Sequence, residues 1–174
     1  REATGRYLFF LNSDTILLNN AVKYFFDFCE GHPDEKIGAL GAILKDQNQK
    51  NIHSYGKFIT PVGEIMDVVS KYLRFLKKRE YLHPASVFQP EAVDYITGAD
   101  LFVPRNVCDE LGVFDPAFFM YCEEVDWQFR MAKAGYKRFV IDGPLIIHLE
   151  GGSDPSNTRL WSFNRIENIF RSKL

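Results

Sequence analysis

Two apolar runs separated by a helical pattern limit the fold of this chain more than any other feature. Residues 6–11 (RYLFFL) and 37–44 (IGALGAIL) are almost wholly apolar, and residues 21–29 between them carry apolar side chains at helical spacing. A continuous apolar run of this length is typical of a strand that is buried on both faces, as in a parallel sheet. The sequence therefore predicts a strand–helix–strand unit of an α/β domain.

The rest of the chain continues this alternation, with one interruption. Extended runs at 92–96 and 100–103 flank a Thr97–Gly98–Ala99 turn, and strands are predicted at 138–141 and 145–148. Asn19 and Asn20 can cap the helix predicted at 21–29. A second helix is predicted at 105–111, with Pro104 in its first turn and Gly112 at its end. Two more are predicted at 123–134, which ends at Gly135, and at 158–171 after Ser156 and Asn157. Residues 45–90 are polar and rich in Gly and Pro, so we expect an excursion, with a basic helix at 68–81, inside one domain spanning 1–174.

Composition excludes several classes of protein. The chain has 174 residues, enough for one domain, and a net charge of −2, which argues against a general nucleic-acid binder. Its three cysteines are far apart in sequence, which favours reduced thiols in the cytoplasm over disulfides or a zinc site. No apolar run approaches the roughly 20 residues of a membrane span. Because Arg1 is followed almost at once by an apolar run, without an initiator Met, we expect the chain to begin inside a domain.

Asn12–Ser13–Asp14 directly follows the first apolar run. In open α/β sheets, ligands bind beyond the carboxyl ends of the strands, where a carboxylate can hold Mg²⁺ or Mn²⁺ against a diphosphate. The same three residues are equally suited to a polar turn in which Asp14 bonds to the local backbone. The motif alone leaves both interpretations open.

A second group of acidic residues begins the helix predicted at 123–134. Glu123, Glu124 and Asp126 could supply a general base, or they could simply offset the helix dipole. Asp126 and Arg130 are four residues apart, so a structural ion pair accounts for Asp126. Glu124 is about 100° from Glu123 around the helix and shares its side with Gln128, without a cation three or four residues on. Glu124 is therefore the freer carboxylate.

Two further positions could take part in binding or catalysis. His148 follows an apolar run and precedes a Gly-rich segment, so it is either a ligand for a first-row metal ion or a hydrogen-bonded structural residue. Gly98 permits a close approach that a side chain would block, which suits a substrate lying over the backbone or a simple turn.

The order of these motifs resembles the family 2 glycosyltransferases of the GT-A fold, and most of all their rhamnosyltransferase-like group. Residues 112–136 (GVFDPAFFMYCEEVDWQFRMAKAGY) carry most of the resemblance, and residues 3–15 (ATGRYLFFLNSDT) resemble the strand that ends in the family's DxD-type motif. The resemblance covers most of the chain and is weakest over 45–90. It implies a mixed sheet flanked by helices, truncated at the N-terminus, where the family has a strand–helix–strand region that binds the nucleotide.

The resemblance also implies roles for individual residues. Asp14 would be the carboxylate nearest a divalent metal ion, Mg²⁺ or Mn²⁺, and Asn12 would occupy the first position of the cofactor-binding motif. His148 matches the second metal ligand, and Glu124 matches the catalytic base. The family usually has Asp at both position 12 and position 124. The residues matched to the acceptor side are Gly98, Ala99, Asp100, Glu123 and Trp127.

The implied reaction is an inverting transfer of a sugar from a nucleotide-diphospho-sugar to a hydroxyl of a glycan or lipid-linked acceptor. Glu124 takes the proton of the hydroxyl, and the nucleoside diphosphate leaves from the metal. The resemblance further implies bacterial surface polysaccharide synthesis in the cytoplasm, with peripheral contact at the inner face of the cell membrane. We also expect weak nucleotide binding by this chain alone, and a second copy covering an open strand edge.

Three other functions remain open from sequence alone. A divergent, non-catalytic module for binding or assembly would tolerate the changes at 12 and 124. A nucleotidyltransferase would carry a Gly-rich loop upstream of these motifs. A membrane-surface protein would use the basic stretch 71–79, although a solvated helix face explains that stretch as well.

Overall fold

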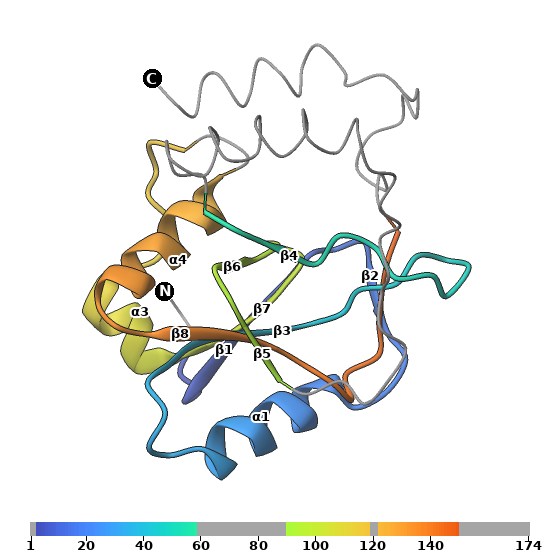
Figure 1. Cartoon of the computed structure of the whole chain (residues 1–174), viewed down its shortest axis with the longest axis horizontal. Helices are drawn as coiled ribbons and strands as arrows, with labels where there is room; N and C mark the ends of the chain where they lie inside the picture. Colours follow the sequence, from blue (N-terminus) through green and yellow to red (C-terminus); the bar gives the residue numbers. More distant parts are fainter. Residues whose placement is uncertain (1–2, 59–89, 119–121, 150–174) are drawn as a thin grey trace, which may run out of the picture.

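The computed structural model describes residues 3–58, 90–118 and 122–149. Figure 1 shows the elements, which in chain order are β1 (Tyr7–Leu11), β2 (Thr15–Leu17), α1 (Ala21–Gly31), β3 (Ile37–Ala42), β4 (Tyr55–Gly56), β5 (Glu91–Val93), β6 (Tyr95–Ile96), β7 (Asp100–Pro104), α3 (Arg105–Leu111), α4 (Glu123–Lys133), β8 (Lys137–Ile141) and β9 (Ile146–His148). The helices predicted at 68–81 and 158–171, and most of the predicted excursion at 45–90, lie outside the described residues. Within the described ranges, every helix is too short or too polar to cross a membrane.

The central sheet has five strands in the order β1-β7-β3-β8-β5. β3 and β8 are parallel, whereas β7 is antiparallel to both β1 and β3. β1 and β3 therefore run in the same direction, as the predicted strand–helix–strand unit requires, but β7 lies between them. The expectation that β1 is buried on both faces was wrong, because β1 is an outer strand of the described sheet and is half-buried from Tyr7 to Phe10.

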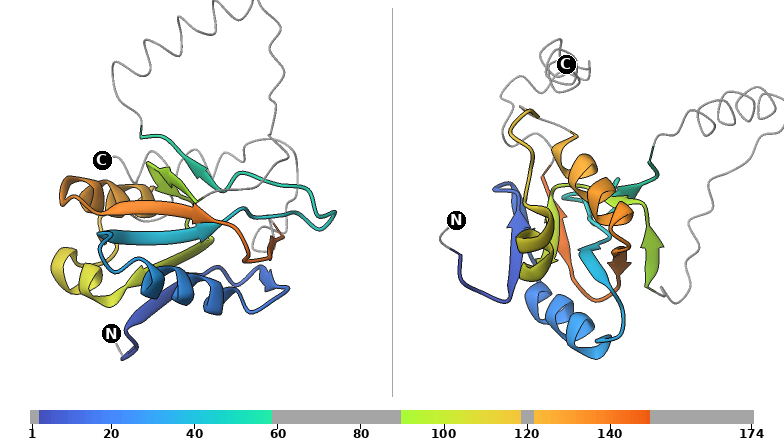
Figure 2. Two further views of the ribbon diagram at one scale, coloured as in Figure 1. Left: turned by 60° about the horizontal axis from the view of Figure 1, so that its bottom comes forward. Right: turned by 90° about the vertical axis from the view of Figure 1, so that its left-hand side faces the viewer.

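Helices cover both faces of this sheet. On one face α1 packs Phe25 against Leu40 and Phe102, and on the other α4 packs Trp127 and Met131 among the side chains of the same strands. Figure 2 shows α1 and α4 on opposite sides of the strands. The alternation of side chains along each strand produces two apolar clusters, one for each face. The result is the mixed α/β architecture expected from the sequence.

The ends of the helices predicted at 105–111 and 123–134 are confirmed to within one residue, whereas α1 continues two residues beyond the predicted end at 29. The side-chain oxygen of Asn20 accepts a hydrogen bond from the backbone N–H of Lys23 at 3.2 Å and so caps α1. Gly112 follows α3 with φ +70°, and Gly135 follows α4 with φ +81°, both in the left-handed region that favours glycine. Pro104, expected in the first turn of α3, is instead its N-cap and the last residue of β7, because its ψ of 139° is extended.

Two small sheets extend the carboxyl edge of the central sheet. β2 pairs with β9, and β4 pairs with β6, both antiparallel. Lys45, just beyond β3, bridges to Ile147 of β9. The segments that follow β1 and β3 are thereby joined to the segment that follows β8.

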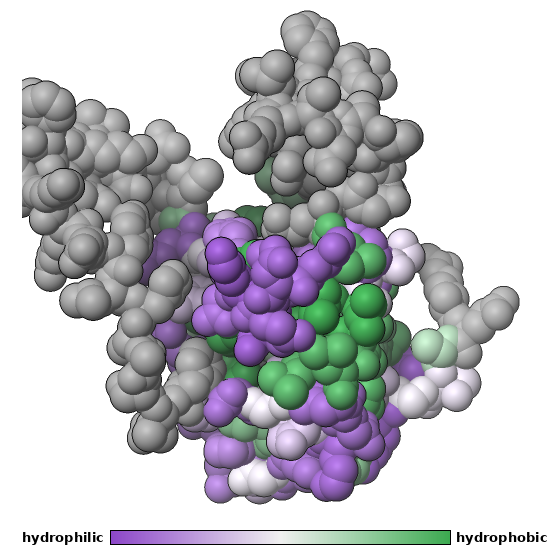
Figure 3. Space-filling view, turned by 90° about the vertical axis from the view of Figure 1, so that its right-hand side faces the viewer, coloured by the Kyte–Doolittle hydropathy of each residue, from purple (hydrophilic) through white to green (hydrophobic). Residues whose placement is uncertain are grey.

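Most of the large apolar side chains that are exposed in the described chain lie between residue 11 and residue 26. They are Leu11, Ile16, Leu17, Leu18, Val22, Tyr24 and Phe26. Figure 3 views the molecule from the β2 side and shows an apolar patch beside a hydrophilic one. An apolar surface beside an open strand edge is typical of a contact site. A second copy of the chain at this edge stays a prediction.

Candidate active site

Asp14 and His148 come together where β2 pairs with β9. Thr15 is opposite His148 in the register, and the backbone N–H of Leu149 donates to the carbonyl of Asp14 at 2.9 Å. This pairing brings Nε2 of His148 to 3.3 Å from Oδ1 of Asp14. The two side chains are largely buried, with 17% and 14% of their surfaces exposed. The backbone N–H of His148 also donates to the carbonyl of Lys45, which fixes the histidine on its other side.

The chemistry of this pair fits a divalent cation. Two neighbouring ligands of an octahedral ion, each about 2.1 Å from the metal, lie about 3.0 Å apart. The 3.3 Å separation of the Asp14 oxygen and the His148 nitrogen is close to that value. A carboxylate with an imidazole suits Mn²⁺ and similar ions. In the described part of the chain, no group of three or more His, Cys, Asp or Glu side chains could hold a metal. The pair would therefore share the ion with oxygen ligands of a substrate or water.

Asn12 contributes through its backbone. Its N–H donates to the carbonyl of Ala99 at 3.0 Å, and its own carbonyl accepts from the N–H and the hydroxyl of Thr15. Its side chain is exposed. The turn that carries Asp14 is thus tied to the segment before β7.

Glu124 lies in the first turn of α4, against the same segment. A Cβ added to Gly98 would lie 3.6 Å from Cβ and Cγ of Glu124, so the backbone of Gly98 faces this side chain directly. Burial raises the pKa of Glu124, and the charge of Glu123 adds to the rise, whereas backbone N–H groups at the start of α4 lower it. Glu124 makes no ion pair with any described residue. It is therefore a half-buried carboxylate with a raised pKa, as a general base requires.

The other acidic residues of α4 have different surroundings. Asp126 forms the predicted ion pair with Arg130, with the Arg130 Nε 2.9 Å from Oδ2 of Asp126. Arg130 also donates to the carbonyls of Leu111 and Val113, so this pair fastens α4 to the end of α3. Oε2 of Glu123 is buried and has no hydrogen-bond partner among the described residues. The ion pair thus accounts for Asp126, as the sequence predicted.

Three residues matched to the acceptor side lie in the interior instead, and one of them is Ala99, which is 3% exposed and belongs to an apolar cluster. Asp100 is 0% exposed, and its Oδ2 accepts from the backbone N–H of Ala42 at 2.7 Å. Trp127 is also 0% exposed, because it shares the inward face of α4 with Met131, and its Nε1–H donates to the carbonyl of Gly112. The side chains of Asp100 and Trp127 therefore support the structure, and neither presents a surface to an acceptor. Gly98 and Glu123 are partly exposed.

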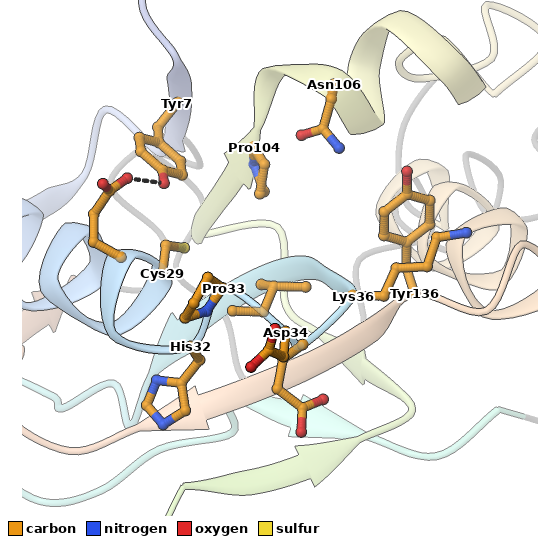
Figure 4. Close-up of a pocket in the computed structure, with 12 residues that line it drawn as sticks. Tyr7, Cys29, His32, Pro33, Asp34, Lys36, Pro104, Asn106 and Tyr136 are labelled. Atoms are coloured by element: carbon orange, nitrogen blue, oxygen red, sulfur yellow. Dashed lines mark hydrogen bonds between the residues drawn. The ribbon is translucent and has the colours of Figure 1, made fainter.

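A cavity of about 510 Å³ lies at the opposite edge of the sheet, where β1 and β3 begin. Figure 4 shows that Tyr7, Lys36 and Tyr136 line it from different segments. Tyr7 donates to Glu30, and Lys36 donates to the carbonyl of Ala134 while it lies over the Tyr136 ring. None of the predicted site residues lines this cavity.

Gln128 is the residue that the sequence interpretation missed. It is fully buried, and its side-chain amide bonds to both backbone groups of Ile96 and to the carbonyl of Glu124. One feature of the sequence could have indicated its role: Gln128 lies one turn after Glu124, next to the apolar positions of the same helix.

Sequence comparisons connect the chain to rhamnosyltransferases. No protein-family model matches it. Rhamnosyltransferase WbbL of Escherichia coli K12 is 24% identical over 148 residues, which are 85% of this chain and 54% of that protein. The N-acetylglucosaminyl-diphospho-decaprenol L-rhamnosyltransferase of Mycobacterium tuberculosis is 30% identical over 83 residues, which are 46% of this chain and 26% of that protein. The chain thus spans about half the length of the first relative and about a quarter of the second.

Structural comparison shows the fold. The crystal structure of GalNAc-T7 with UDP, GalNAc and Mn²⁺ matches 84% of this chain and 28% of that one, with a TM-score of 0.53 and 13% identity. The chain has the mixed α/β fold of the GT-A glycosyltransferases, and the names of its sequence relatives support a glycosyltransferase.

Proposed function

We propose that this chain forms the metal-binding and general-base part of an inverting glycosyltransferase of family 2. The observation that carries the proposal is the Asp14–His148 pair, a carboxylate and an imidazole 3.3 Å apart beyond the carboxyl ends of β1 and β8. Ligands of open α/β sheets bind at this edge. Glu124 lies at the same edge, because Gly98 faces it and Ala99 is hydrogen-bonded to Asn12.

Asp14 and His148 would hold a divalent cation, Mg²⁺ or Mn²⁺. When bound, such an ion offsets the charge that develops on the diphosphate of a leaving nucleotide. Asp14 would supply a carboxylate oxygen to the ion, and the imidazole of His148 would supply a nitrogen ligand. The pairing of β2 with β9 keeps the two groups in place before any substrate binds.

Glu124 would act on the acceptor. Its carboxylate takes the proton of an acceptor hydroxyl as the hydroxyl oxygen attacks the anomeric carbon. A raised pKa makes a carboxylate a stronger base once it is ionised, which favours this transfer. The base and the leaving group act on opposite faces of the sugar, so a single displacement inverts the anomeric configuration.

The names of the relatives support a more specific substrate pair. One relative is named as a rhamnosyltransferase, and the other as acting on an N-acetylglucosaminyl-diphospho-decaprenol. We therefore propose a nucleotide-diphospho-sugar donor, with rhamnose as the first sugar to test, and a lipid-linked glycan acceptor. Such an acceptor would place the enzyme at the inner face of the bacterial cell membrane, in surface polysaccharide synthesis.

The test is transfer by the complete natural polypeptide that contains this chain. Glu124→Gln should lower kcat at least a hundredfold, because general-base catalysis contributes about 10² to 10⁴ in rate. Asp126→Asn is the matched control in the same helical turn. It removes an ion pair and should cost stability while transfer continues. Transfer by Glu124→Gln at the wild-type rate would reject Glu124 as the base, whereas absence of transfer by the wild-type polypeptide would favour a non-catalytic module.

A further inference from the structure

Gln128 joins α4 to the segment that precedes β7. Its Oε1 accepts from the backbone N–H of Ile96 at 2.8 Å, and its Nε2 donates to the carbonyl of Ile96 at 2.7 Å. The same Nε2 donates to the carbonyl of Glu124, one turn earlier in the helix, at 3.1 Å. One side chain thus pairs with both backbone groups of Ile96 while it is bonded to the turn that carries Glu124.

The position of Ile96 determines where the next residues lie. Ile96 ends β6, where it is opposite Tyr55 of β4, and its side chain is 0% exposed. Two residues later the backbone of Gly98 faces the side chain of Glu124, because a Cβ added to Gly98 would lie 3.6 Å from Cβ and Cγ of Glu124. The carbonyl of Ala99 then holds the N–H of Asn12, which begins the turn to Asp14.

Packing alone does not explain an amide at this position. The buried positions of α4 are Trp127, Gln128 and Met131, and an apolar side chain would fill the middle one without needing partners. A buried polar group costs free energy unless it is hydrogen-bonded, so it is retained where its bonds specify one arrangement. Here the hydrogen bonds of Gln128 fix the position of α4 relative to residues 96–99. An apolar residue would pack against that segment but would leave the two backbone groups of Ile96 without their partner.

We propose that Gln128 is a positioning residue, which sets the place of the Glu124 carboxylate over the Gly98 backbone and so its reach to the acceptor hydroxyl. The proposal rests on the proposed function, since it needs Glu124 to be the base. Gln128 itself does not touch the substrate. Its loss should therefore slow the chemical step and leave donor binding unchanged.

The decisive comparison uses two buried positions of the same helix in the complete polypeptide. Gln128→Met keeps the length of the side chain but removes all three hydrogen bonds. Met131→Ala destabilises the same helix through a cavity but leaves those bonds in place. Transfer is measured at a temperature at which both variants are folded, as judged by circular dichroism, with kcat and the donor KM determined separately.

We expect Gln128→Met to lower kcat about tenfold to a hundredfold, because a misplacement of about 1 Å costs up to that factor, with a donor KM within twofold of the wild type. Met131→Ala should keep kcat within twofold. Gln128→Glu keeps an acceptor for the N–H of Ile96 and should recover part of the kcat lost in Gln128→Met.

Two results would overturn the inference, and they differ from each other. If Glu124→Gln abolishes transfer while Gln128→Met and Met131→Ala have equal kcat, Glu124 remains the base but Gln128 is not a positioning residue. If Glu124→Gln and Gln128→Met both transfer at the wild-type rate, the general-base part of the proposed function is wrong, and the positioning role is wrong with it.

Discussion

The two edges of the central sheet differ in how their carboxylates are paired. At the edge where β1 and β3 begin, Glu35 forms an ion pair with Lys137, and Glu30 accepts from Tyr7. At the carboxyl edge, Glu124 and Asp100 are buried without an ion pair among the described residues, and burial raises the pKa of both. Unpaired carboxylates with shifted pKa values mark functional sites more often than paired ones do. The cavity where β1 and β3 begin is therefore at the edge less suited to catalysis.

The largest difference between the edges should appear in metal binding. Asp14→Ala should weaken Mn²⁺ binding at least tenfold, since even outer partners of metal ligands are worth about tenfold to a hundredfold. His148→Ala should act in the same direction. Electron paramagnetic resonance of free Mn²⁺ measures both. Glu35→Ala at the other edge is the control, and an equal loss there would remove the distinction between the two edges.

The pH dependence of transfer should follow Glu124. Because its pKa is raised above the ordinary 4.5, the rate should fall on the acid side at a higher pH than an ordinary Glu would give. Removing the nearby charge in Glu123→Gln lowers the pKa of Glu124, so the acid limb should move to lower pH. A pH–rate profile of kcat/KM records this shift. A limb that moves to higher pH would contradict the assignment of the base.

Asp100 should make stability depend on pH. Burial raises its pKa well above 3.8, while the N–H of Ala42 opposes the rise. The folded protein then keeps a proton that the unfolded chain releases, so its contribution is complete below pH 3.8 and declines as the pH rises toward the raised value. Asp100→Asn keeps an acceptor for Ala42 and does not ionise. Urea unfolding across this pH range should give a flatter stability curve for the variant, and an unchanged slope would show that Asp100 is ionised when folded.

The smallest effect should come from the ion pair Glu35–Lys137. Its side chains are 38% and 54% exposed, and exposed pairs contribute about 0–1 kcal/mol. Glu35→Gln should therefore change the free energy of unfolding by less than about 1 kcal/mol and leave transfer unaffected. A thermal melt of the variant beside the wild type checks this. A larger loss of stability would mean that the ion pair contributes more than the exposure of its two side chains implies.

Local patterns predicted the features that depend on neighbours in sequence. The cap at Asn20, the ends of α3 and α4, and the Asp126–Arg130 pair all follow from residues within one helical turn. The place of His148 at the end of a short strand also followed from a local apolar run. Each of these depends on spacing that the sequence displays directly.

Features that depend on contacts between residues far apart in the sequence could not be predicted. Nothing local to Asp100 indicates that its carboxyl meets the N–H of Ala42, which comes from another strand, so its burial was missed. The insertion of β7 between β1 and β3 and the link from Gln128 to Ile96 depend on the same kind of long-range contact. The roles of Glu124 and Asp14 in catalysis stay predictions.

The most direct test is a crystal structure of the complete polypeptide with Mn²⁺ and a nucleoside diphosphate, read by the anomalous signal of manganese. The account predicts one ion about 2.0 to 2.3 Å from both Oδ1 of Asp14 and Nε2 of His148, with diphosphate oxygens as further ligands. An ion bound elsewhere, such as among the acidic side chains of the cavity at the opposite edge, with Asp14 and His148 left uncoordinated, would contradict it.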